Sequence, residues 1–140
     1  MTPDAFARLH AAAFTNPRPW SSTEFAALLA QPTTVAVAAE QGFALGRLIG
    51  EEAELLTIAV APAARRQGVG RDLLRRFVAA VAARGGRTIF LEVSSLNDSA
   101  IALYLGEEFH KIALREDYYS HAGQRADALI MRRNVTANDI

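Results

Sequence analysis

A glycine-containing turn between a predicted strand and a predicted helix restricts the fold of this chain most. The apolar run 55–60 predicts a strand, and residues 71–84 carry the apolar stripe of an amphipathic helix. Between them lies the segment Arg65–Arg71, which contains Gly68 and Gly70. The first N–H groups of a helix have no intrahelical partner, and glycine lets an anion approach the backbone closely. The sequence therefore predicts a binding site for a phosphate or pyrophosphate at the start of this helix.

Two other phosphate-binding motifs do not fit this segment. A Walker-type loop needs Gly-x-x-x-x-Gly-Lys-Ser/Thr, and a dinucleotide fingerprint needs Gly-x-Gly-x-x-Gly. The sequence contains neither. A bare Gly-x-Gly also occurs in tight turns that bind nothing, but the order Arg-x-x-Gly-x-Gly between a strand and a helix is more specific.

Composition argues against several other classes of protein. A chain of 140 residues with 51% apolar residues predicts one folded domain, residues 1–140. The formal net charge is zero, which argues against broad binding to nucleic acid or membrane surfaces. The chain has no cysteine, no apolar run long enough to span a bilayer and no N-terminal signal pattern. We therefore expect a cytoplasmic protein without disulfides, thiolate metal sites, or membrane and nucleic-acid partners.

The rest of the chain alternates between helix and strand patterns. Helices are predicted over residues 3–14, 21–30, 71–84 and 97–104, and strands over residues 34–39, 43–49, 54–60, 88–93, 109–115 and 126–133. The run 55–60 lacks strict alternation, which predicts a central strand covered on both faces. The strand–helix–strand order over residues 54–93 predicts a parallel pair with a right-handed connection.

Several segments, taken together, resemble one family. The loop Arg65–Arg71 resembles the acetyl-CoA pyrophosphate loop of the GCN5-related N-acetyltransferases (GNAT). The chain is most similar to the ribosomal-protein-alanine N-acetyltransferase branch of that superfamily, over about residues 16–131. The matching segments are 18–21, 58–62, 65–71, 91–93, 97–104, 118–119 and 127–131.

The resemblance implies an α/β (α+β) fold. Its centre would be a mixed, mostly antiparallel sheet of six or seven strands with about four flanking helices. The family's first strand precedes its first helix, whereas this sequence starts almost at the helix. We therefore expect this edge strand to be absent or contributed differently.

The activity implied by the resemblance is acetyl transfer from acetyl-CoA to an amine, without a metal, through a ternary complex. The expected acceptor is the N-terminal α-amine of a protein, with a ribosomal protein beginning with alanine as the implied substrate. An α-amine has a pKa of about 8, against about 10.4 for lysine, so a mild base is sufficient. Acetylation of a small-molecule amine and a non-catalytic acetyl-CoA-binding role stay open as alternatives. The branch also implies association with tRNA-modification proteins.

The resemblance assigns cofactor contacts to two stretches and two single residues. The backbone of Ile58-Ala59-Val60 would pair with the pantetheine arm, and one amide, that of Val60, would polarise the thioester carbonyl. These three residues can also form part of the core, and the two roles are compatible. Asn97 and Tyr104 would also contact the cofactor, although Asn97 equally suits the N-cap of a helix. The loop residues expected to bind the pyrophosphate are Arg66, Gln67, Gly68, Val69, Gly70 and Arg71.

Two residues are candidates for proton transfer. Alternation places Glu92 on the strand face opposite Leu91 and Val93, and partial burial would favour proton uptake by such a carboxylate. The branch uses this glutamate as general base. The alternatives are an exposed structural glutamate and Glu54 as the base. Tyr104 is the candidate acid for the departing thiolate, and its alternative is a helix-packing role.

Aromatic residues are the candidates for acceptor binding. Trp20, Tyr118 and Tyr119 match positions near the peptide groove of the branch, and the alternative for Trp20 is an aromatic cluster under a loop. The histidines have neither metal-ligand nor triad spacing and are expected to be ordinary surface or core residues. Glu108 replaces a glycine of the family. If that position requires a positive φ, we expect strain there and a displaced Tyr104.

Overall fold

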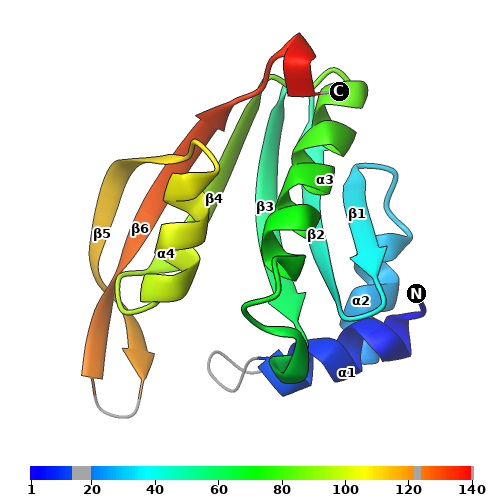
Figure 1. The fold of residues 1–140 in the computed structure, drawn as a ribbon, viewed down its shortest axis with the longest axis horizontal. Helices are drawn as coiled ribbons and strands as arrows, with labels where there is room; N and C mark the ends of the chain where they lie inside the picture. The colour runs from blue at the N-terminus through cyan, green and yellow to red at the C-terminus, as the bar shows by residue number, and fades with distance from the viewer. Residues whose placement is uncertain (14–19, 122–123, 140) are drawn as a thin grey trace.

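A six-stranded sheet in the order β1-β2-β3-β4-β6-β5 forms the centre of the computed structural model, which describes residues 1–13, 20–121 and 124–139 (Figure 1). The β3–β4 pair is parallel and the other four pairs are antiparallel. The expected mixed, mostly antiparallel sheet is therefore confirmed. The strands are β1 (Thr34–Ala39), β2 (Gly42–Ile49), β3 (Glu52–Val60), β4 (Thr88–Ser94), β5 (His110–His121) and β6 (Gln124–Asn134).

Four α-helices flank the sheet within the described residues, as expected. They are α1 (Pro3–Ala13), α2 (Ser22–Leu29), α3 (Val69–Ala83) and α4 (Asp98–Gly106). Ser21 and Glu24 form the capping box at the start of α2, since each side chain accepts a hydrogen bond from the other residue's backbone N–H. The first described element is α1, so no described strand precedes it. None of the helices in the described ranges is long and apolar enough to cross a membrane.

The helices cover opposite faces of the sheet and create two cores (Figure 1). The larger core joins α3 and α4 to the sheet through residues such as Leu74, Phe77 and Leu91. The smaller core joins α1 and α2 to the other face through Phe6, Phe25 and Phe43, whose ring centroids lie 4.4–5.6 Å apart. We call this second group, with His10 and Trp20, the aromatic cluster.

Strand β3 lies between these two layers. Ile58 and Val60 pack against the larger core, while Ala59 packs on the opposite face, with the smaller core. The predicted central strand covered on both faces is therefore confirmed. The lack of alternation has a local cause, because the register with β2 shifts at Leu56, where a β-bulge reverses which face each side chain takes.

The sheet splits between β3 and β4. These strands pair at three positions, from Glu52–Thr88 to Glu54–Phe90, whereas β4 pairs with β6 at seven. Beyond Glu54 the two strands diverge, as Figure 1 shows. The edge of residues 58–60 that faces away from β2 therefore has no strand partner among the described residues.

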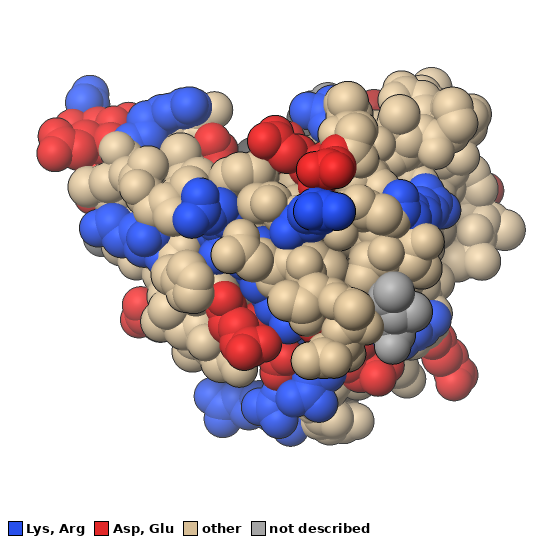
Figure 2. All heavy atoms as spheres, turned by 90° about the horizontal axis from the view of Figure 1, so that it is seen from above, with Lys and Arg blue, Asp and Glu red and all other residues tan. Residues whose placement is uncertain are grey.

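Positive and negative side chains are interspersed on the surface. Seen from above, Lys and Arg alternate with Asp and Glu over the end of the molecule that carries the C-terminus (Figure 2). Elsewhere, exposed ion pairs such as Arg87–Glu51 and Arg47–Glu54 join opposite charges on the surface. The face shown in Figure 2 therefore presents no large patch of one sign.

Candidate active site

The loop after β3 leaves main-chain donors exposed at the start of α3. The backbone is left-handed at Arg66 (φ 64°) and at Gly68 (φ 80°), which is the N-cap residue and provides no side-chain cap. The first intrahelical bond runs from the Asp72 N–H to the Gly68 carbonyl, at 3.0 Å. The N–H groups of residues 69–71 therefore have no partner within the helix, and they lie at the positive end of its dipole.

Gly70 marks the point where three elements meet. A methyl group at this position would lie 3.5 Å from Leu103 Cδ2 of α4 and 3.7 Å from Val60 Cγ2 of β3. The loop, the open edge of β3 and α4 are therefore adjacent. The structure brings together three separate sequence segments that contain the candidate cofactor-binding residues.

Two of the polar loop side chains make local contacts. The Gln67 side-chain amide donates to the Ala63 carbonyl at 3.3 Å, and Arg71 Nε lies 3.5 Å from Glu107 Oε1 at the end of α4. Glu107 also accepts a hydrogen bond from Arg75 Nε at 3.0 Å, so it joins α3 to α4. The main-chain N–H groups are therefore available to an anion, together with the exposed side chains of Arg65 and Arg66.

The helix α4 positions Asn97 and Tyr104. Asn97 Oδ1 accepts hydrogen bonds from the Ala100 N–H at 3.2 Å and the Ser99 hydroxyl at 3.3 Å, so the N-cap alternative is observed. The Tyr104 ring is buried and packs 5.9 Å from the Phe109 ring centroid. Burial raises the pKa of Tyr104 to about 12, so the hydroxyl keeps its proton throughout the neutral range.

Glu108 adopts the left-handed backbone that glycine would take, with φ 71°. The Phe109 N–H donates to the Tyr104 carbonyl at 3.0 Å, and the Glu108 N–H donates to the Leu105 carbonyl at 3.3 Å. This pair of bonds is a Schellman motif, which ends α4 in the usual way. The expected positive φ at a non-glycine residue is therefore present.

Glu92 lies on the sheet face opposite α4. Ile89, Leu91 and Val93 are buried, whereas the Glu92 side chain is 36% exposed. The side chain is thus partly rather than fully exposed, although α1 and α2 lie over the other half of this face (Figure 1). Glu92 Oε1 lies 3.9 Å from Arg115 Nη1 on β5.

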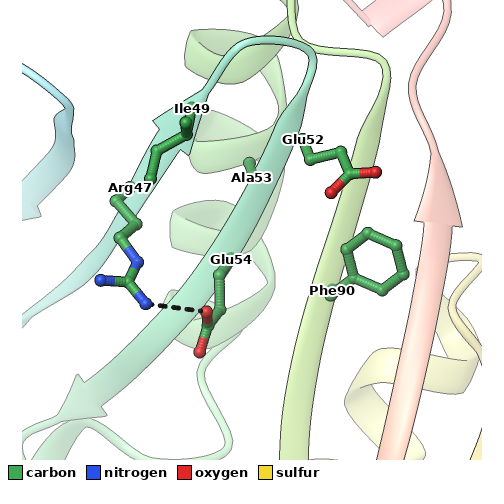
Figure 3. Close-up of a pocket in the computed structure, with 6 residues that line it drawn as sticks. All are labelled: Arg47, Ile49, Glu52, Ala53, Glu54 and Phe90. Carbon is green, nitrogen blue, oxygen red and sulfur yellow. Dashed lines mark hydrogen bonds and ion pairs between the residues drawn. The ribbon is translucent and has the colours of Figure 1, made fainter.

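The alternative base, Glu54, lies on the same face at the last paired position of β3. Its carboxylate contacts Arg47 Nη2 at 3.3 Å. Figure 3 shows Glu54 and Arg47 at the edge of an open hollow that Glu52 and Phe90 also line. Glu54 is therefore already paired within the exposed face of the sheet.

The aromatic residues proposed for the acceptor separate into two places. Tyr118 is 48% exposed, and Arg115 Cζ lies 4.5 Å from its ring centroid, a cation–π contact. Arg115 thus contacts both Glu92 and Tyr118. Tyr119 pairs with Ala126 through its backbone, and its side chain lies outside the described residues.

Trp20 belongs instead to the aromatic cluster. Its backbone N–H donates to His10 Nδ1 at 2.9 Å, and the two rings stack at 5.1 Å. His10 is 4% exposed, and its burial lowers its pKa to about 4, against a smaller opposing effect of Glu24. The alternative interpretation of Trp20 as part of a packed cluster is observed, while the matched residues 18–19 lie outside the described ranges.

Sequence reasoning missed Arg115 and Asp127. The Asp117 N–H, in an irregular stretch of β5 with φ 51°, donates to Asp127 Oδ1 at 3.0 Å. The Asp127 N–H donates to the Ser95 hydroxyl at 3.1 Å, so this residue joins the hairpin to the loop before α4. Both residues contact residues that are distant in the sequence, so the spacing of residues within one segment does not predict these contacts.

The described residues contain no group of three His, Cys, Asp or Glu side chains arranged to hold a metal ion. The unpaired loop donors and the open edge of β3 do fit an acetyl-CoA molecule, which needs donors for a diphosphate and for an amide-bearing arm. This arrangement defines the class of protein. A family model described as "Acetyltransferase (GNAT) family" matches residues 4–107, and the chain belongs to this family. It is an acetyl-CoA-dependent N-acetyltransferase.

Two relatives with known names cover most of the chain. The ribosomal protein bS18-alanine N-acetyltransferase of Escherichia coli strain K12 is 37% identical over 117 residues, 81% of this chain and 79% of that protein. The N-alpha-acetyltransferase RimI of Mycobacterium tuberculosis is 39% identical over 137 residues, 91% of this chain and 84% of that protein.

A solved structure confirms the fold. The crystal structure of the ribosomal-protein-S18-alanine N-acetyltransferase from Escherichia coli superposes with a TM-score of 0.83 and 32% sequence identity. The match covers 96% of this chain and 87% of that one. The expected GNAT fold is therefore confirmed.

Proposed function

We propose that this protein acetylates the N-terminal α-amine of a protein, with a ribosomal protein that begins with alanine as the substrate. The observation that carries the proposal is the split between β3 and β4, which lies between the exposed donors of the α3 loop and the exposed carboxylate of Glu92. A relative named as a ribosomal protein bS18-alanine N-acetyltransferase matches 81% of the chain, and one named as an N-alpha-acetyltransferase matches 91%, which supports this acceptor class.

The two substrates approach from opposite faces of the sheet in this proposal. The loop Arg66–Arg71 and α4 lie on one face, whereas Glu92 and Tyr118 belong to the strands whose other face is open. A thioester in the split would then be reached by an amine from the opposite side. Direct transfer in a ternary complex follows, since both substrates fit at once and no protein nucleophile is required.

The loop and β3 bind the cofactor through their backbones. The N–H groups of Gly68, Val69, Gly70 and Arg71 bind the diphosphate, with Arg66 and Gln67 as neighbours in the loop. The open edge of Ile58, Ala59 and Val60 pairs with the pantetheine arm, and the Val60 N–H donates to the thioester oxygen as negative charge develops there. The N-cap role of Asn97 uses its side-chain oxygen, so its side-chain N–H groups can donate to the cofactor.

Glu92 acts on the attacking amine, and Tyr104 acts on the departing sulfur. Glu92 accepts the proton of the attacking amine, while a new N–C bond forms and the C–S bond breaks. Tyr104 donates a hydrogen bond to the departing sulfur. Because its pKa of about 12 exceeds that of an ordinary thiol, about 8.5, it stabilises the thiolate without transferring its proton completely.

Tyr118, Tyr119 and Trp20 complete the acceptor side. Arg115 contacts both Tyr118 and Glu92, so these two side chains lie near each other. An extended N-terminus can therefore contact the Tyr118 ring while its amine reaches the Glu92 carboxylate. Trp20 contributes to the acceptor side from the aromatic cluster, where it packs against His10 and Phe25. Association with tRNA-modification proteins stays a prediction from the resemblance.

A peptide panel tests the acceptor class. The protein is incubated with acetyl-CoA and a peptide that begins with alanine and contains one internal lysine, and the modified nitrogen is located by fragmentation mass spectrometry. We expect acetylation of the α-amine, and none when that amine is blocked by formylation. Turnover of polyamines or aminoglycosides together with inactivity on all peptides would favour a small-molecule acetyltransferase and contradict the proposal.

A further inference from the structure

The turn that ends α4 requires an unfavourable backbone conformation. Glu108 has φ 71°, a region in which a side chain crowds the following carbonyl and which glycine occupies freely. The residue stands at the position after the C-cap residue Glu107. The two hydrogen bonds of the Schellman motif stabilise the turn from within, and a contact from outside would stabilise it further.

Arg133 of β6 provides this stabilisation. Its Nη2 atom lies 2.9 Å from Glu108 Oε2 and 2.9 Å from Asp139 Oδ1, so one nitrogen holds both carboxylates. The Arg133 side chain is 11% exposed, and its Nε is buried without a hydrogen-bond partner in the described ranges. A buried guanidinium with an unsatisfied donor is costly, and the two carboxylates offset this cost, Asp139 from a largely covered position and Glu108 from a side chain that is 78% exposed.

Asp139 is held in turn by the end of the chain. Its Oδ2 accepts a hydrogen bond from the Thr136 N–H at 2.8 Å, within the turn 136–139. The Val135 N–H donates to the Arg87 carbonyl at 2.8 Å, which fixes the start of that turn beside β4. The C-terminal turn thus presents its carboxylate to Arg133 in one orientation.

The same turn fixes the backbone of Tyr104. The Tyr104 carbonyl accepts the N–H groups of Glu107 at 3.1 Å and Phe109 at 3.0 Å, on either side of Glu108. The Tyr104 ring packs against the Phe109 ring. A change in the Glu108 conformation would therefore move both the carbonyl contacts and the ring contact of Tyr104.

We propose that Arg133 is a positioning residue for Tyr104, because it holds Glu108 in the left-handed conformation that orients the end of α4. The inference rests on the proposed role of Tyr104 in acetyl transfer. A chain with glycine at position 108 would adopt that conformation without such a partner.

The test compares Arg133→Met with the double variant Arg133→Met/Glu108→Gly. We expect Arg133→Met to lower kcat about five- to tenfold at saturating substrates, while the Kd for acetyl-CoA stays unchanged. Adding Glu108→Gly restores kcat to within about twofold of the wild type, because glycine accepts the turn unaided. The matched control is Arg87→Met, which removes an exposed arginine paired only loosely with Glu51, at 3.6 Å.

Melting temperature is measured on the same samples to separate positioning from stability. If the double variant stays as slow as Arg133→Met, or if Arg133→Met keeps the wild-type kcat, the inference is wrong. Should Arg133→Met fail to fold, Glu108→Ala replaces it, since this variant retains the Arg133–Asp139 contact and the unfavourable φ. A wild-type kcat in Glu108→Ala overturns the inference equally.

The proposed function can fail separately. A wild-type protein that acetylates no N-terminal amine contradicts the proposed function, and a wild-type rate in Tyr104→Phe contradicts the role of that tyrosine. An active wild type, an impaired Tyr104→Phe and an unimpaired Arg133→Met together contradict only the positioning role.

Discussion

The two sides of the split sheet differ in what they offer a substrate. On the α3 side, the proposed cofactor site consists of main-chain N–H groups at the turn of Gly68 and an unpaired strand edge beyond the last β3–β4 pair. On the opposite side, the available groups are the side chains of Glu92, Arg115 and Tyr118, which come from two strands that are not adjacent in the sheet. A backbone site depends on local conformation, whereas a side-chain site depends on tertiary contacts. The first tolerates most substitutions and the second does not.

The largest effect is expected for the candidate base. Glu92→Gln should lower kcat about a thousandfold, within the usual range for loss of a general base, and leave the Kd for acetyl-CoA nearly unchanged. Steady-state kinetics and calorimetric titration measure the two quantities. The matched control is Glu54→Gln, on the same face and already paired with Arg47, for which we expect less than a twofold change. A large fall in kcat for Glu54→Gln together with a small change for Glu92→Gln would assign the base to Glu54.

The aromatic cluster beneath the acceptor side should respond to pH through His10. Burial lowers the pKa of His10 from 6.5 to about 4 in the native protein. Between about pH 6.5 and pH 4, His10 is therefore protonated in the unfolded chain but neutral in the native protein. The free energy of unfolding should therefore decrease as the pH falls through this window, by at most about 3 kcal/mol, and the contribution is fully present above pH 6.5. Urea denaturation at pH 7.5, 5.5 and 4.5 measures it.

A matched substitution isolates this contribution. His10→Asn should flatten the dependence relative to the wild type, whereas replacing the exposed His110 by Asn should leave the wild-type slope. Equal slopes in all three proteins would show that His10 does not control the pH response.

On the cofactor side, a small steric change should matter more than loss of a side-chain charge. Gly70→Ala should raise the Kd for acetyl-CoA about tenfold, because the new methyl stands between Val60 and Leu103, on the route from the loop to the edge of β3. The contacts at 3.5 Å and 3.7 Å are ordinary and alanine favours the helix more than glycine does, so the melting temperature should not fall. Gly106→Ala, which meets nothing within 4 Å, is the control. An unchanged Kd in Gly70→Ala would place the cofactor elsewhere.

The smallest effect is expected for the exposed acceptor tyrosine. Tyr118→Ala should raise the KM for an alanine-initiated peptide about fivefold with kcat nearly constant, because the ring contributes binding and no chemistry. Tyr118→Phe keeps the ring and should stay within twofold of the wild type. A fall in kcat without a change in KM would show instead that Tyr118 positions Glu92 through Arg115.

Local patterns predicted the cofactor side better than the acceptor side. The glycine turn depends on a few consecutive residues and the parallel pair on the order of three consecutive elements, and the structure has both. The exposure of Glu92 could not be read from β4 alone, because it depends on how far α1 and α2 extend over the sheet. Arg115 was missed because its contacts cross from β5 to β4 past β6.

Glu108 is an intermediate case. Its departure from the family glycine predicted a strained turn, and φ 71° agrees with that prediction. The compensating contact with Arg133 could not be predicted, because the partner lies 25 residues later and is fixed by a third residue at the end of the chain.

Calorimetric titration with two thioesters tests the main-chain diphosphate site most directly. The folded protein is titrated with acetyl-CoA and with S-acetylpantetheine, which has the same thioester and arm but lacks the diphosphate and nucleotide. We expect one acetyl-CoA per chain and at least about a hundredfold weaker binding of S-acetylpantetheine, with the difference reduced in Gly70→Ala. Equal affinity for the two thioesters, or no binding of acetyl-CoA by folded protein, would contradict the assignment of the α3 loop.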